Sequence, residues 1–135
     1  MIMDKPNIFT ETVIVEKDHL DELNHVNNVQ YLQWIQDIAK HHWEARADKI
    51  WLEKYAWVAL NHFIEYKKPA FLGENLLLQT HVHEFEGVKS NRLVRISNQE
   101  TGDLLVQSST SWCVIDRDRN KPTRVLEAMV KAFSD

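Results

Sequence analysis

The sequence predicts an α+β domain in which one long helix lies against an antiparallel sheet. From Asn28 to Asp48, apolar residues recur at steps of three and four with no proline or glycine, as in an amphipathic helix. After Trp51 the pattern changes to long β-rich stretches joined by short turns, which favours strands that pair with their sequence neighbours. A helix segregated from such strands is typical of the α+β class.

The elements follow one another without repeats or linkers. Residues 9–17, FTETVIVEK, alternate and predict a strand at the edge of the sheet. A polar loop at 18–27 precedes the helix. The helix is expected to bury one stripe, formed by Val29, Leu32, Ile35, Ile38, Ala39, His42 and Trp43. Further strands are predicted at 57–73, 74–87, 88–103 and 104–118, followed by a short helix at 123–133.

Length and composition restrict the class of protein. The 135 residues suit one domain, residues 1–135, and the formal charge of −4 gives no electrostatic reason to bind nucleic acid. A single cysteine, Cys113, excludes an internal disulfide. No stretch reaches the roughly 18 apolar residues that span a bilayer, and the start lacks a secretory signal. We therefore expect a cytoplasmic protein without membrane insertion.

The predicted sheet is too large for one helix to cover. Both of its edge strands would expose unpaired backbone groups, which natural proteins protect. We expect self-association as a homodimer with sheets joined edge to edge, or as a homotetramer of such dimers. The five tryptophans are expected in the core or in a subunit interface.

The loop before the long helix carries the most specific pattern, in HLDELNHVNNVQYLQW at 19–34. Asp21, the run from His25 to Asn28, and Tyr31 resemble the active-site segment of the hot-dog-fold thioesterases, in the 4-hydroxybenzoyl-CoA thioesterase-like branch. The segment is most similar to bacterial acyl-CoA thioesterases of that branch. The resemblance continues in EYKKPAFLGENLLLQT, GVKS and SWCVIDRDRNKPT, so it covers nearly the whole chain. It implies a single hot-dog domain, with a long central helix wrapped by a five-stranded antiparallel sheet.

The resemblance also implies catalytic roles for Asp21, His25 and Asn28. Asp21 would be the base or nucleophile, the amide of Asn28 or its neighbour would bind the thioester carbonyl, and His25 would orient the carbonyl or a water. Helix-start amides suit the carbonyl because a developing oxyanion is stabilised by donors at the positive end of a helix. Asn27 would fix the loop and help bind substrate. The structural alternatives are that Asp21 or Asn27 only caps the helix and that His25 is a buried loop residue.

One departure from the family affects the mechanism. Several relatives carry a histidine seven residues after the aspartate and a tyrosine four residues before it. Here those positions are Asn28 and Lys17. The division of labour between Asp21 and His25 therefore stays open.

Further residues are expected to bind the substrate. Lys67 and Lys68, with Lys89 and Arg92 as further candidates, flank strand ends and could hold the phosphates of coenzyme A, although they could equally be solvated charges. Ser90, in the family's Gly-x-Lys-Ser turn, would line the pantetheine channel or serve as a structural hydroxyl. The acyl tunnel is expected to be lined by Tyr31, Trp34 and Ile35.

The sequence-based hypothesis is an acyl-CoA thioesterase that releases a free acid, most simply a fatty acid, and CoA. No metal or redox cofactor is expected, because His41, His42, His81 and His83 lack a zinc-site pattern, and coenzyme A enters only as part of the substrate. The alternatives are an acyl carrier protein thioesterase, a hot-dog hydratase or dehydratase, and a non-catalytic acyl-binding protein. The hydratase pattern Gly-Asp-x-Asn-Pro-x-x-His is absent from this loop.

Overall fold

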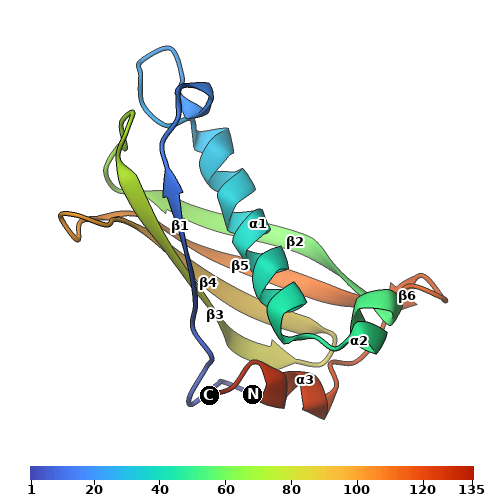
Figure 1. The fold of residues 1–135 in the computed structure, drawn as a ribbon. Helices are drawn as coiled ribbons and strands as arrows, with labels where there is room; N and C mark the ends of the chain where they lie inside the picture. Colours follow the sequence, from blue (N-terminus) through green and yellow to red (C-terminus); the bar gives the residue numbers. More distant parts are fainter.

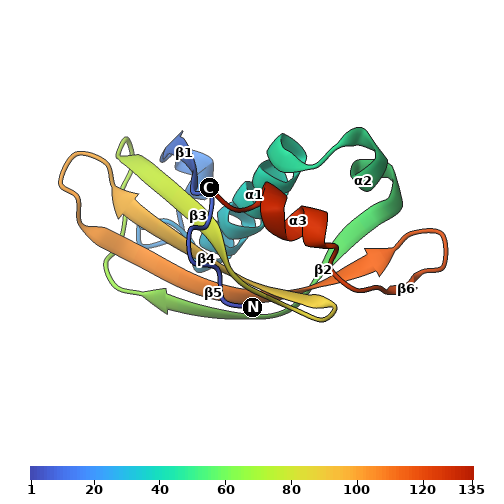
Figure 2. The same cartoon turned by 90° about the horizontal axis from the view of Figure 1, so that it is seen from below.

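In the computed structural model, which describes residues 1–135, one long helix, α1 (Asn28–Arg46), lies across the concave face of a curled antiparallel sheet (Figures 1 and 2). The strand order is β1-β3-β4-β5-β2. The strands are β1 (Phe9–Ile14), β2 (Tyr55–Tyr66), β3 (Asn75–Glu86), β4 (Lys89–Asn98) and β5 (Leu104–Asp116), with β6 (Lys121–Pro122) added beside β5. This arrangement confirms the predicted α+β class.

Both edges of the sheet follow from the topology. β1 pairs only with β3 and forms one edge, as predicted, while β2 pairs only with β5 and forms the other. A bulge between Ala59 and Asn61 in β2 and another between Val82 and Glu84 in β3 increase the local twist. The sheet therefore curls around α1 instead of lying flat beneath it (Figure 2).

Helix α1 begins and ends at the residues that its sequence favours. Its N-cap is Asn27, and at Ala47 the backbone turns extended. The predicted buried stripe was partly wrong. Val29 is 71% exposed, whereas Tyr31 and Trp34 are buried. At about 100° per residue, Val29 lies roughly 120° around the axis from the buried Ile35, which places it outside the core-facing side.

Three short elements were not predicted. They are η1 (Lys17–His19), α2 (Lys49–Lys54) and β6. Because the Asp48 side chain accepts a hydrogen bond from the Trp51 amide, the chain restarts as a helix after α1 ends. The predicted strands were also too long at several ends, and the last helix, α3 (Glu127–Ala132), is shorter than predicted.

The interior has two parts separated by polar side chains. The main core packs the first half of α1 against β3, β4 and β5. Two smaller clusters lie beneath the second half of α1, where α3 closes the end of the sheet (Figure 1). Between them the sheet presents buried polar residues to the helix, namely Thr80, Arg92, Ser108 and Thr110. No helix is long and apolar enough to cross a membrane.

Candidate active site

The loop between β1 and α1 folds back on itself as a narrow hairpin. The Asp21 amide donates to the His25 carbonyl over 2.8 Å, and Leu20 and Val26 form an isolated antiparallel bridge. Asn24 adopts a left-handed conformation with φ of 61°, which asparagine tolerates better than most residues. The hairpin projects beyond the N-terminal end of α1 (Figure 1) and holds its polar residues there.

The carboxylate of Asp21 holds this hairpin together through one oxygen. Its Oδ1 accepts hydrogen bonds from the Leu23 amide at 2.9 Å and from the His25 amide at 3.1 Å. Its Oδ2 makes no hydrogen bond within the chain. Asp21 therefore does not cap α1, and its side chain is fixed in orientation with one oxygen available to a ligand or a water.

The start of α1 leaves one amide free. The Asn27 Oδ1 caps the helix by accepting from the Val29 amide at 2.9 Å, and the Asn27 carbonyl accepts from the amides of Gln30 and Tyr31. The amide of Asn28 makes no hydrogen bond within the chain and the residue is exposed. A free amide at the positive end of a helix is a favourable place for a negatively charged oxygen.

A second loop, residues 67–74 between β2 and β3, closes over the first. The Val26 amide donates to the Ala70 carbonyl at 3.0 Å, and His25 and Phe71 form a backbone bridge. The His25 ring meets the Phe71 ring edge-on, with 5.2 Å between centroids. His25 is therefore only half-buried and lies between the two loops, beside the Asp21 hairpin.

Tyr31 lies one turn into the helix and is buried. Its ring packs against those of Trp34 and Tyr66. Burial raises the pKa of Tyr31 to about 12, an effect that the nearby Ala70 backbone partly offsets. The hydroxyl makes no well-aligned hydrogen bond, so it is a buried polar atom that is able to form one.

Lys67 and Lys68 lie in the second loop and so share this end of the molecule. The Lys67 Nζ is 3.9 Å from Glu65, and the Lys68 Nζ is 3.4 Å from Asp103. All four side chains are substantially exposed. Exposed ion pairs contribute at most about 1 kcal/mol, so these lysines remain available to a phosphate.

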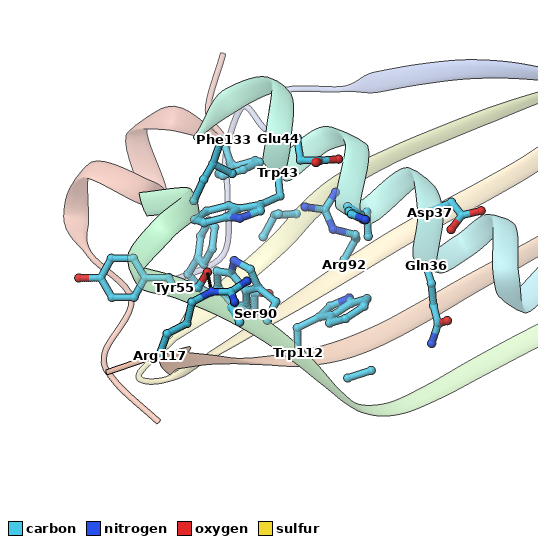
Figure 3. Close-up of a pocket in the computed structure, with 18 of the residues that line it drawn as sticks. Gln36, Asp37, Trp43, Glu44, Tyr55, Ser90, Arg92, Trp112, Arg117 and Phe133 are labelled. Carbon is cyan, nitrogen blue, oxygen red and sulfur yellow. Dashed lines mark hydrogen bonds between the residues drawn. The ribbon is translucent and has the colours of Figure 1, made fainter. Parts of the chain in front are cut away.

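Ser90 is not brought to this site within one chain. It lies on β4 and lines a pocket of about 660 Å³ beneath the second half of α1 (Figure 3). From Asn28 to Trp43, which also lines that pocket, the helix rises about 22 Å. Arg92 lines the same pocket and is buried, so its expected place at a strand end was wrong. Arginine is rarely buried, and a sequence-based prediction therefore places it at the surface.

The apolar surface around the hairpin was not predicted from the sequence. Leu23, Val29, Phe71 and Leu72 are all exposed there, on the two loops and the first turn of α1. Exposed apolar side chains that gather beside a polar site are a signal of an interaction surface. Elsewhere, the structure brings no three His, Cys, Asp or Glu side chains together in a way that could hold a metal ion.

A long helix held inside a curled antiparallel sheet is the hot-dog fold. The chain belongs to the family described as acyl-ACP thioesterase N-terminal domain, which matches residues 6–133. The predicted membership of the hot-dog thioesterases is thus confirmed. No curated protein matches the sequence.

Solved structures share the fold at low sequence identity. A probable thioesterase from Escherichia coli, YbaW, is 21% identical with a TM-score of 0.85, over 93% of this chain and 98% of that one. Slr0204, a 1,4-dihydroxy-2-naphthoyl-CoA thioesterase from Synechocystis, is 18% identical with a TM-score of 0.81, over 94% and 96%. SAV2348 from Staphylococcus aureus, solved in complex with CoA, is 15% identical with a TM-score of 0.82, over 98% and 83%.

Proposed function

We propose that this protein hydrolyses an acyl-CoA thioester to a free acid and CoA. Two observations carry the proposal: the amide of Asn28 at the start of α1 is free, and the hairpin that leads into this helix holds the Asp21 carboxylate in a fixed orientation. Family membership supports the reaction class. The 1,4-dihydroxy-2-naphthoyl-CoA thioesterase and the CoA complex among the similar structures support CoA as the carrier.

The proposed reaction uses few groups. A water attacks the thioester carbonyl carbon while Asp21 Oδ2 takes a proton from that water. The carbonyl oxygen becomes an oxyanion, which accepts a hydrogen bond from the Asn28 amide. The C–S bond then breaks, the acid leaves, and the CoA thiolate recovers a proton. One well-placed donor to an oxyanion typically changes the rate by ~10²–10³. His25, between the two loops, orients the water or the carbonyl.

A second route gives Asp21 a different role. Its carboxylate could attack the carbonyl itself, forming an acyl anhydride with the enzyme that water then hydrolyses. One turnover in ¹⁸O-labelled water tests for the nucleophilic route in which water attacks the Asp21 side of the anhydride. The nucleophilic route leaves ¹⁸O in the Asp21 carboxylate when water attacks its carbonyl carbon. The general-base route puts all of the label into the released acid.

The site is proposed to be completed by a second copy of the chain. The main pocket of the single chain does not include Asp21, His25 or Asn28. The apolar residues around the hairpin are uncovered, and the β2 edge carries exposed Val58 and Leu60 with no neighbouring strand. Pairing of two β2 edges would satisfy backbone groups and bring a second surface toward the hairpin.

Acyl carrier protein is the alternative carrier, and the description of the matching family favours it. A partner of that acidic kind needs a broad basic surface, whereas this chain carries a formal net charge of −4, and Lys67 and Lys68 are two local cations that suit the phosphates of a small carrier. We therefore favour CoA, with a fatty acyl group as the simplest substrate. Competing the two carriers of one acyl group in a single assay decides between them.

The decisive experiment is the Asp21→Asn variant assayed with acyl-CoAs of increasing chain length, with the released thiol as readout. Because the amide oxygen can still accept from Leu23 and His25, the hairpin should keep its shape. Turnover should fall by about 10²-fold or more. The matched control is Glu22→Gln, an exposed neighbour that should change little. Unchanged turnover in Asp21→Asn would refute the proposed role, and a folded wild type that cleaves neither carrier would be an acyl-binding protein.

A further inference from the structure

The pocket beneath the second half of α1 contains a buried cation without a carboxylate partner. Arg92 is 6% exposed, and its Nη1 donates to His42 Nδ1 at 2.8 Å and to Thr80 Oγ1 at 3.1 Å. Both acceptors are neutral. The guanidinium also lies over the Phe133 ring, with 5.9 Å to its centroid.

The histidine partner cannot supply a negative charge. A guanidinium only donates, so His42 Nδ1 accepts, and the Nε2–H donates to Asn7 Oδ1 over 2.8 Å. Burial first, and the charge of Arg92 second, lower the pKa of His42 to about 3. The imidazole is therefore neutral. Although burial lowers the pKa of Arg92 to about 10, the guanidinium stays charged near neutral pH.

No acidic side chain neutralises this charge. Asp37 and Glu44 are the acidic residues among those that line the pocket, and neither forms an ion pair with Arg92. The pocket also holds Lys40 and Arg117, so its cationic residues outnumber its acidic ones. A buried charge without a counter-ion is costly, and that cost would be relieved by an anion in the pocket.

The side chains of Ser90, Arg92 and Trp112 all carry hydrogen-bond donors and lie on one patch of the sheet. Ser90 and Arg92 are two residues apart on β4 and therefore share a face, and Ser90 is directly opposite Trp112 on β5. The indole Nε1–H of Trp112 is buried without an acceptor. The Ser90 hydroxyl and the Nε and Nη2 groups of Arg92 also lack partners within the chain. Figure 3 shows Arg92 and Trp112 at the cavity between the sheet and α1.

Hydrophobic residues make up more than half of the lining, and several of them are aromatic. Trp43 and Trp57 meet edge-on with 5.7 Å between centroids, and Trp43 stacks on Phe133 at 5.9 Å. Of the 19 lining residues, 11 are hydrophobic, which suits a ligand with a bulky apolar body. A negatively charged oxygen of such a ligand would accept hydrogen bonds from Ser90, Arg92 and Trp112 on the sheet.

We propose that this pocket binds a compact carboxylate, whose two oxygens accept from Arg92, Ser90 and Trp112 and whose apolar body packs against the tryptophans. The site is separate from the Asp21 hairpin within the chain. The proposal does not rest on thioester hydrolysis, because binding is measured without a thioester.

The test uses adamantane-1-carboxylate, a rigid apolar acid that does not absorb where tryptophan does, and its neutral amide. Tryptophan fluorescence and calorimetry should show one saturable site for the acid, with a dissociation constant below about 1 mM. The amide should bind at least about tenfold more weakly, because hydrogen bonds to a charged acceptor are the stronger ones. No saturable binding, or equal binding of acid and amide, would overturn the proposal.

Variants locate the site. Arg92→Met should weaken binding of the acid at least about tenfold, and Trp112→Phe, which keeps an aromatic side chain but loses the indole N–H, about threefold or more. The control is Arg95→Met, because Arg95 is an exposed arginine three residues further along β4 and therefore on the opposite face of the sheet. If Arg92→Met fails to fold, the binding of the acid by Ser90→Ala and Trp112→Phe tests the proposal instead. Unchanged binding in the folded variants overturns the proposal. A further outcome also overturns the proposal: the wild type is an oligomer that does not bind the acid, and the Arg92→Met variant dissociates. In that case a carboxylate of a partner chain neutralises Arg92.

Discussion

Mild acid should destabilise this fold through one buried imidazole. His42 is fully buried, and its pKa is lowered from 6.5 to about 3. Burial lowers this pKa most, and the charges of Arg92, Arg46 and His81 lower it further. The unfolded chain takes up a proton near pH 6.5, whereas the folded chain does so near pH 3. Protons therefore favour the unfolded state between these two values.

The magnitude follows from this separation. Each unit of pKa difference corresponds to about 1.4 kcal/mol, so between pH 6.5 and 4.5 His42 should remove about 2–3 kcal/mol from the free energy of unfolding. This is a large part of the 5–15 kcal/mol typical of a domain. Above about pH 7.5 the imidazole is neutral in both states, and its contribution no longer varies with pH.

The measurement is urea unfolding of wild type and His42→Gln across this range. Other titrating groups contribute to both curves, so the difference between the two proteins isolates His42. We expect the wild type to lose stability more steeply below pH 6.5, with the two curves parallel above about pH 7.5. Parallel curves throughout would show that His42 is protonated as readily in the fold as in the unfolded chain.

Two substitutions near the hairpin test the local geometry. Asn27→Ala removes the cap of α1 and should lower the free energy of unfolding by about 1 kcal/mol, measured by urea titration; no loss would mean that the Val29 amide finds another acceptor. Tyr31→Phe deletes a buried oxygen without a well-aligned partner, so stability should be unchanged or rise by up to about 1 kcal/mol in the same assay. A loss above about 2 kcal/mol would reveal a strong hydrogen bond to that hydroxyl.

The long elements were predictable because their periodicity extends over many residues. The helix from Asn28 and the strands after it were found from steps of three or four and of two. The short helix α2 was not found, since six residues carry too little pattern and its start depends on one side chain, Asp48. The exposure of Val29 was missed because a valine in an apolar pattern is assigned to the core by its type, although its phase on the helix is poor.

The candidate site was predictable only in its local part. Asp21, His25 and Asn28 lie in one loop, so their proximity follows from the chain itself. The contact of that loop with residues 67–74 depends on tertiary packing, and no local pattern shows that Val26 donates to Ala70. The donors at Ser90 and Arg92 meet Trp112 through strand register, which is set by turns and bulges that the sequence indicates poorly.

The hydrogen bond from His42 to Asn7 ties the N-terminal segment to the centre of the molecule. The Asn7 Oδ1 accepts a hydrogen bond from the Nε2–H of His42, so a residue ahead of the first strand helps to hold the ring whose Nδ1 accepts from Arg92. The Asn7 amide in turn donates to the Phe133 carbonyl, so the segment ahead of β1 is also held to the C-terminal end of the chain. Trimming the first seven residues would therefore act at a distance, by removing an acceptor that holds the His42 ring in place against Arg92.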